Sequence, residues 1–183
     1  FIWDSYCDWY IELTKARLYG EDEAQKRSAQ QVLLYVLDQI LRLMHPFMPF
    51  ITEEIWQAIP HEGEALIVAA WPKFREDLCF QAEEDGMESI MQAIRAVRNR
   101  RAEMNVPPAR RTTLYIVTEK QDLFSAGIPF ITRLAYAERV VVLAEEPEGH
   151  GSMVSCVTHD AKLFLPMEEL VDVDKELARI AKE

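Results

Sequence analysis

The sequence predicts an α+β fold, in which a helical bundle is followed by a small α/β module and the start of a coiled-coil helix. Apolar residues recur at helical spacing through the first part of the chain. Alternating, β-branched segments appear only in the second part. The chain of 183 residues is 49 % hydrophobic and has six glycines, which indicates a folded, helix-rich protein.

The first part is predicted to contain three helices. Residues 1–19 form the first, which Gly20 ends. The second, over residues 21–44, is expected to bury a stripe made of Val32, Val36, Ile40, Leu43 and Phe47. The third starts with Thr52 as its N-cap and runs to about residue 59. Residues 66–69 are expected to form a short extended piece.

The connection between the second and third helices is predicted to be a rigid elbow. Pro46 and Pro49 end the second helix, because proline lacks a backbone N–H and its ring clashes with the preceding turn. This connection is unusually apolar for a loop, so we expect it to be buried. Its apolar residues are Met44, Phe47, Met48, Phe50, Ile51, Ile55 and Trp56.

The second part is predicted to interleave strands with helices, as in an α/β module. A linker over residues 72–86 leads into it. The predicted elements are a helix over 81–104, a strand over 112–118, an interrupted helix over 122–137, a strand over 139–143, a hairpin over 153–158 and 162–165, and a coiled-coil start from 171. The predicted domains are therefore 1–72, 73–170 and 171–183.

The charge of the chain argues against nucleic-acid binding overall but allows it on one side. The net charge is −11, whereas phosphate binding normally requires a basic surface. The segment from Gln92 to Arg111 nevertheless holds six arginines against one glutamate. A narrow basic edge on an acidic body is compatible with one-sided contact to RNA.

Cysteine usage and hydropathy exclude several classes of protein. Cys7, Cys79 and Cys156 are few, odd in number and scattered, which favours a reducing cytoplasmic location and predicts neither disulfides nor a metal site. No apolar run approaches the roughly 18 residues that a membrane span needs, so no membrane partner is expected.

Five segments, taken in order, resemble the C-terminal, anticodon-binding region of bacterial valyl-tRNA synthetases, which are class I aminoacyl-tRNA synthetases. They are residues 1–13, 42–56, 66–72, 94–108 and 165–176. Arg100 departs from the pattern, because relatives usually have an aliphatic residue there. Position 1 is not methionine and falls inside a predicted helix, so we expect the chain to be a piece of a longer protein.

The resemblance implies that the parent protein attaches valine to tRNA(Val), using ATP and Mg²⁺ in a catalytic domain upstream. The His-Ile-Gly-His and Lys-Met-Ser-Lys-Ser sequences of that centre are absent here, so no catalytic residue and no cofactor are expected in this chain. The implied partners are tRNA(Val) and the upstream catalytic and editing domains.

The resemblance places the part of the first helix that matches Ile11, Glu12 and Lys15 beside the anticodon pocket. On chemistry alone, Glu12 could accept from a base amine, Lys15 and Arg17 could donate, and Tyr10 could stack. The simpler alternative is that Glu12 and Lys15 form a surface pair three residues apart.

The arginine segment is predicted to serve two roles. Arg95 and Arg98 lie beside the apolar stripe of their helix and are candidates for phosphate contact. Arg101 projects from the stripe itself, where a guanidinium needs a partner, so we expect an acid of the first domain to pair with it. Arg101 and Trp56 are therefore the predicted domain-interface residues.

Two rival functions stay open from the sequence. One is a relative that charges isoleucine or leucine tRNA. The other is a helical protein-interaction module whose acidic surface excludes nucleic acid.

Overall fold

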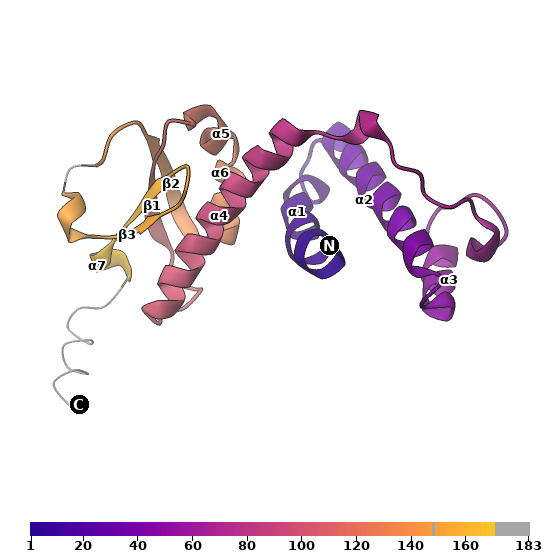
Figure 1. Ribbon diagram of the computed structural model, residues 1–183. Coiled ribbons are helices and arrows are strands. Elements are labelled where there is room, and N and C mark those ends of the chain that lie inside the picture. The colour runs from indigo at the N-terminus through magenta and orange to yellow at the C-terminus, as the bar shows by residue number, and fades with distance from the viewer. Residues whose placement is uncertain (148, 171–183) are drawn as a thin grey trace. The chain divides into compact units, whose positions relative to one another are not determined.

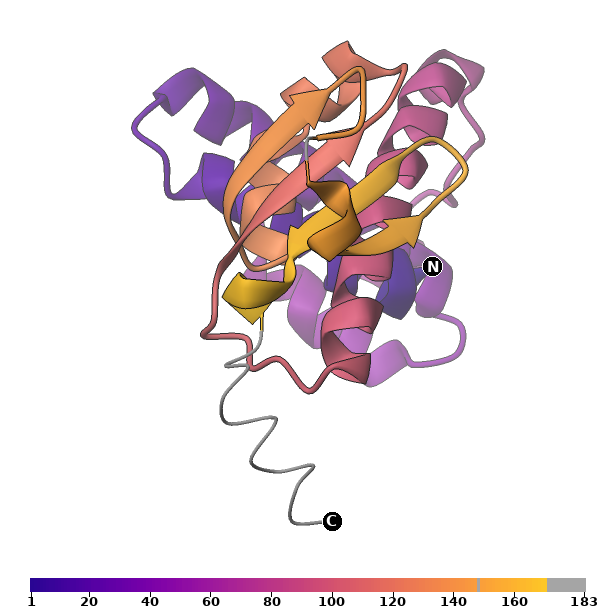
Figure 2. The same ribbon diagram turned by 90° about the vertical axis from the view of Figure 1, so that its left-hand side faces the viewer.

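The computed structural model describes residues 1–147 and 149–170 and divides the chain into two compact units, Phe1–Cys79 and Phe80–Glu183 (Figures 1 and 2). The division falls inside the predicted linker over residues 72–86. The predicted coiled-coil start at 171–183 lies outside the described residues. Within the described part, none of the helices combines the length and the apolar character needed to cross a bilayer.

The first unit begins with a helix of two kinds. A π-helical stretch, η1 (Ile2–Ile11), continues directly into α1 (Glu12–Leu18). The wider turn is visible in the backbone, where the Tyr6 N–H donates to the carbonyl oxygen of Phe1 at 3.1 Å. Tyr6 and Trp9 are buried, as the predicted helix requires.

Helix α2 (Glu23–Met44) has a clear start. The Asp22 side chain accepts hydrogen bonds from the backbone N–H groups of Ala24 and Gln25, at 2.9 and 3.2 Å. This satisfies donors that have no partner in the first turn of a helix.

The predicted stripe of α2 is only partly buried. Ile40 is buried as expected, together with its neighbour Leu41. Val32, Leu43 and Phe47 are exposed, because the described neighbours of α2 cover only part of its surface.

The predicted elbow differs from the observed one in two ways. Helix α3 spans Pro49–Ala58, with Met48 as its N-cap, so the prediction of Thr52 as N-cap is wrong. Proline suits the first turn because its missing N–H would have no helical partner there. The prediction of a buried elbow is also wrong, since Phe47 and Phe50 are 84 % and 90 % exposed.

Trp56 forms the core of the first unit with Leu41 and Leu66, and it is fully buried. Its Nε1–H donates to Asp38 Oδ1 at 2.8 Å. The prediction that Trp56 is a domain-interface residue is therefore wrong: its side chain lies inside the first unit. Leu66 belongs to a 3₁₀ turn, η2 (Leu66–Val68), and not to the predicted extended piece.

The second unit contains every element predicted for residues 81–166. After the short turn η3 (Glu76–Leu78) at the end of the first unit, the elements are α4 (Gln81–Glu103), β1 (Thr112–Val117), α5 (Gln121–Ala126), α6 (Ile128–Leu134), β2 (Ala137–Leu143), η4 (His150–Ser152), β3 (Met153–Val157), β4 (Lys162–Pro166) and α7 (Met167–Leu170).

The four strands form one mixed sheet in the order β2-β1-β4-β3. Strands β1 and β2 are parallel, which requires the crossover through α5 and α6, whereas the other two pairs are antiparallel.

Helix α4 packs against β3 and α6 and buries Ile90, Ile94 and Val97 as predicted. Alternate residues of β1 are buried, among them Leu114 and Ile116. The approach of α4 to the start of α6 is close, because a Cβ at Gly127 would lie 2.8 Å from Ile90 Cδ1. Any larger residue at position 127 would force these helices apart.

Arg101 is buried near the end of α4, and its guanidinium is satisfied inside the second unit. It donates to the Pro107 carbonyl oxygen at 3.1 Å, to Thr112 Oγ1 at 3.3 Å and to the Arg110 carbonyl oxygen. Burial lowers the pKa of Arg101. The predicted acidic partner from the first domain is replaced by these three uncharged oxygens, so Arg101 secures the loop between α4 and β1.

Tyr136 occupies the tight connection between α6 and β2 in a left-handed conformation, with φ of 56°. Its ring lies 5.8 Å from the guanidinium carbons of both Arg98 and Arg101. Stacked cations of this kind stabilise an aromatic ring and the backbone that presents it.

Asp160 links three parts of the second unit. Its carboxylate accepts from Ser89 Oγ of α4 at 2.6 Å and pairs with Lys120 Nζ at 2.9 Å. It also lies 3.0 Å from His159 Nδ1. The hydrogen bonds from Ser89, Lys120 and His159 hold the pKa of Asp160 well below its ordinary value.

We expect Asp38→Ala to destabilise the first unit by about 2–3 kcal/mol, because Trp56 loses a charged hydrogen-bond acceptor in the core. All four tryptophans lie in the first unit, so tryptophan fluorescence during urea unfolding measures this unit alone. The matched control is Glu54→Ala, an exposed acid of α3, which should change the unfolding free energy by less than about 0.5 kcal/mol. Equal effects of the two variants would contradict the structural role of Asp38.

We expect the stability that Asp160 provides to depend on pH. Its pKa is lower in the folded state than in the unfolded chain, so its contribution is present near neutral pH and is lost as the pH falls toward the folded pKa. Wild type should therefore be more stable than Asp160→Asn at pH 7, and the difference should shrink between pH 5 and pH 2. Amide hydrogen exchange of β1 and β4 measures it, and a difference that does not change with pH would refute the assignment.

Candidate nucleic-acid interface

The first helix brings the predicted contact residues Tyr10, Ile11, Glu12, Lys15 and Arg17 together along η1 and α1. Tyr10 is half-buried and stacks on Tyr6, with ring centroids 6.1 Å apart. Burial raises the pKa of Tyr10, and the charge of Arg17 partly offsets that rise. Arg17 itself is exposed at the end of the helix.

Glu12 and Lys15 form an ion pair three residues apart, as the simpler alternative anticipated. Both side chains are about one-third exposed. Exposed pairs of this type stabilise a protein by roughly 0–1 kcal/mol, so the pair can separate at little cost when a phosphate approaches.

The predicted arginine edge is largely used inside the second unit. Arg95 pairs with Glu88 at 3.0 Å. Arg98 donates from Nε to the Leu134 carbonyl oxygen at 2.6 Å and lies over Tyr136. These contacts give Arg98 a structural role that the sequence did not predict.

The remaining arginines of this segment follow the same pattern. Arg100 pairs with Glu103 at 3.0 Å. Arg110 donates to the backbone of residues 168 and 169, and Arg111 donates to the carbonyl oxygen of Ala137 at 3.2 Å. The segment therefore fastens the ends of α4 and β1 to the rest of its unit and does not form a continuous free basic surface.

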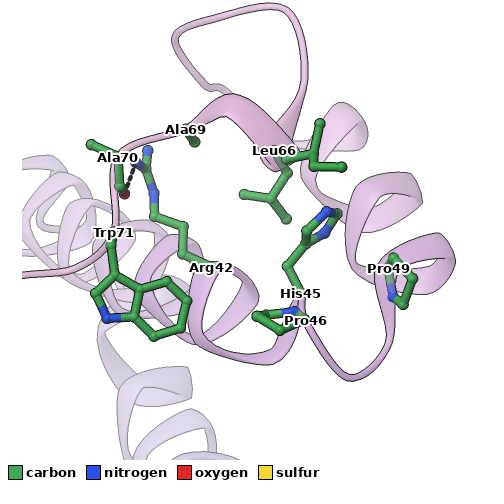
Figure 3. Close-up of a pocket in the computed structure, with 9 residues that line it drawn as sticks. Arg42, His45, Pro46, Pro49, Leu66, Ala69, Ala70 and Trp71 are labelled. Atoms are coloured by element: carbon green, nitrogen blue, oxygen red, sulfur yellow. Dashed lines mark hydrogen bonds between the residues drawn. The ribbon is translucent and has the colours of Figure 1, made fainter.

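A hollow of about 360 Å³ lies beside the elbow of the first unit, and the sequence did not predict it. Figure 3 shows Arg42 and Trp71 on one side, and Leu66, His45 and Pro49 on the other. The hollow is lined by Arg42, His45, Pro46, Pro49, Leu66, Ile67, Ala69, Ala70 and Trp71.

The wall of the hollow is held by hydrogen bonds from α2 and α3. Arg42 Nε donates to Asp38 Oδ2 at 2.8 Å, and Arg42 Nη1 donates to the Ala70 carbonyl oxygen at 3.0 Å. The Leu66 N–H donates to Glu53 Oε2 at 2.9 Å. These bonds fix the loop over residues 66–70 in place, so the hollow is formed before any ligand binds.

The tautomer of His45 follows from its neighbours. Thr52 Oγ1 donates its one proton to the Met48 carbonyl oxygen at 2.8 Å, so it accepts from His45 Nδ1, also at 2.8 Å. His45 Nε2 is then an acceptor, and it is buried without a hydrogen bond among the described residues. His45 thus ties the end of α2 to α3 at the elbow.

The sequence held signals for this hollow that pointed elsewhere. Asp38 and Arg42 lie four residues apart, the spacing of a helical ion pair. Pro46, Pro49 and Trp71 lie far apart in sequence, and only the turn η2 brings Trp71 back to the elbow. Periodicity along one helix does not reveal such a juxtaposition.

Comparison with known proteins agrees with the resemblance. The family model described as the anticodon-binding domain of tRNA ligase matches residues 1–116. Over the whole chain, the sequence is 45 % identical to a valine–tRNA ligase of Enterococcus faecalis, 44 % to one of Geobacillus stearothermophilus and 45 % to one of Clostridium acetobutylicum. The chain covers 21 % of the length of each of these relatives.

The family match begins with the first helix, includes both sides of the elbow hollow, and ends in β1 of the second unit. It thus covers most of the described chain and all of the first unit. On this evidence, the chain belongs to the anticodon-binding domain family of tRNA ligases.

Proposed function

We propose that this chain binds the anticodon stem-loop of tRNA(Val) as one part of a valine–tRNA ligase. The observation that supports the proposal most is identity of 42–45 % over the whole chain with proteins named valine–tRNA ligase. The parent protein would attach valine to tRNA(Val) with ATP and Mg²⁺ bound in a catalytic domain that is not part of this sequence. The chain itself would supply binding energy and specificity.

The first helix offers the groups for this task. Unstacked loop bases present hydrogen-bonding edges and aromatic faces, and proteins recognise them with donors, acceptors and aromatic rings. Glu12 is an acceptor, Lys15 and Arg17 are donors, and all three occur within two turns of α1. The Glu12–Lys15 pair keeps both side chains at the surface in the absence of RNA.

Contacts to phosphate would be few and local. Arg95 is partly exposed and its partner Glu88 is also exposed, so this pair can exchange for a phosphate. Arg98 has a smaller part in the proposal, because its Nε is committed to the backbone of α6. Catalytic and editing domains of the parent and tRNA(Val) are the proposed partners, and the cytoplasm is the proposed location.

The rival functions find less support. The relatives named above are valine–tRNA ligases, which favours valine over isoleucine or leucine as the amino acid of the parent. The match to an anticodon-binding family disfavours a module that binds only protein.

In the complete ligase, we expect Lys15→Ala to lower kcat/KM for charging of tRNA(Val) about ten-fold, since a charged contact to RNA is lost. Valine activation without tRNA, measured as pyrophosphate exchange, should change by less than two-fold. The matched control is Lys26→Ala, which removes a similar pair, with Glu23, from α2. Equal loss of charging and of activation would contradict an anticodon-side role for Lys15.

We expect binding of the 183-residue chain to a tRNA(Val) transcript to weaken with salt. If two or three phosphates are neutralised, the plot of log affinity against log salt concentration should have a slope of about −2 to −3. Fluorescence anisotropy of labelled transcript between 50 and 300 mM KCl gives this slope. Affinity that is independent of salt would instead favour a surface for apolar or protein partners.

A further inference from the structure

The hollow beside the elbow has the properties of a built binding site. Its far wall, residues 66–70, is held by Arg42 and Glu53, and Arg42 is itself held by Asp38. Asp38 in turn binds the core residue Trp56. A chain of hydrogen bonds therefore connects the hollow to the most buried side chain of its unit, which makes its shape stable.

The chemistry of the lining combines a stacking surface with a hydrogen-bond donor. The Trp71 indole is 58 % exposed although it lines the hollow, and it offers a large flat face. Pro46, Pro49, Ala69 and Ala70 add small apolar surfaces around it. Arg42 has two donors left on Nη2, which none of the hydrogen bonds between the described residues uses.

A flat ring with a polar edge matches this lining. Nucleobases stack on exposed aromatic side chains, and arginine donates to their carbonyl oxygens and ring nitrogens. An aliphatic side chain of a protein partner would fill the apolar part but would leave the Arg42 donors unmet. The positive charge next to the ring also suits a ligand attached to a phosphate backbone.

We propose that the elbow hollow receives one unstacked base of the anticodon loop, with its ring stacked on Trp71 and a carbonyl oxygen of the base accepting from Arg42 Nη2. This inference rests on the proposed function, because it takes tRNA as the ligand of the chain. It adds a base-binding site that is separate in sequence from the contact residues of the first helix.

The test measures binding of the whole 183-residue chain to tRNA(Val) transcripts by fluorescence anisotropy. The protein variants are Trp71→Ala, Trp71→Phe and the matched control Phe74→Ala, which removes an exposed aromatic residue that does not line the hollow. The RNA variants each replace one base of the anticodon loop with an abasic nucleotide. Circular dichroism confirms that each protein variant is folded.

We expect Trp71→Ala to weaken binding about ten-fold, because stacking of one base on an aromatic residue is worth roughly 1–3 kcal/mol. Trp71→Phe should retain most of the affinity, and Phe74→Ala should change it by less than two-fold. One abasic position should weaken wild-type binding by a similar factor and have no further effect on Trp71→Ala. This lack of additivity would identify the base that occupies the hollow.

Two results would overturn the inference, and they are distinguishable. If wild type binds the transcript and Trp71→Ala binds equally well, the hollow takes no base while the proposed function stands. The same holds if every abasic position adds its full effect to that of Trp71→Ala, since the indole then acts on something other than a loop base. If wild type does not bind the transcript at all, the proposed function and the inference fail together.

Discussion

The carboxylate of Asp38 is the interaction on which the first unit depends. One of its oxygens accepts from the fully buried Trp56, and the other accepts from Arg42 and Gln39. Through Arg42 the same group reaches the backbone of Ala70 and sets the position of the loop after η2. The core and the elbow hollow therefore share one anchor. Replacement of this anchor by an apolar residue of similar volume would leave an indole N–H and a guanidinium without their acceptors, and the loss would exceed that of a single surface ion pair.

Local sequence patterns predicted the second unit well. The alternation in β1, the interruption at Gly127 and Pro129, and the stripe of α4 each arise from neighbours within one element or one short loop. The first unit was harder to predict because its helices bury only part of their apolar surface. Phe47 and Phe50 have the composition of a core but lie exposed, and hydropathy alone does not distinguish the two situations.

The candidate contact residues show the same division. The first helix was found from its residues and the family resemblance, and the observed Glu12–Lys15 pair matches the spacing. The arginine segment was misjudged, since most of its side chains bond to carbonyl oxygens far away in sequence. Charge counting along a segment cannot reveal these acceptors. The elbow hollow was missed for a related reason, because Trp71 joins it only through the path of the chain after α3.

The left-handed Tyr136 has a consequence for which sequences this fold tolerates. A non-glycine residue in that conformation bears about 1–2 kcal/mol of backbone strain, and glycine would remove it. Glycine would also remove the ring on which Arg98 and Arg101 rest, and with it support for a guanidinium buried between α4 and β1. The substitution that suits the main chain thus harms the side-chain packing, so mutational drift at this position is opposed from both directions.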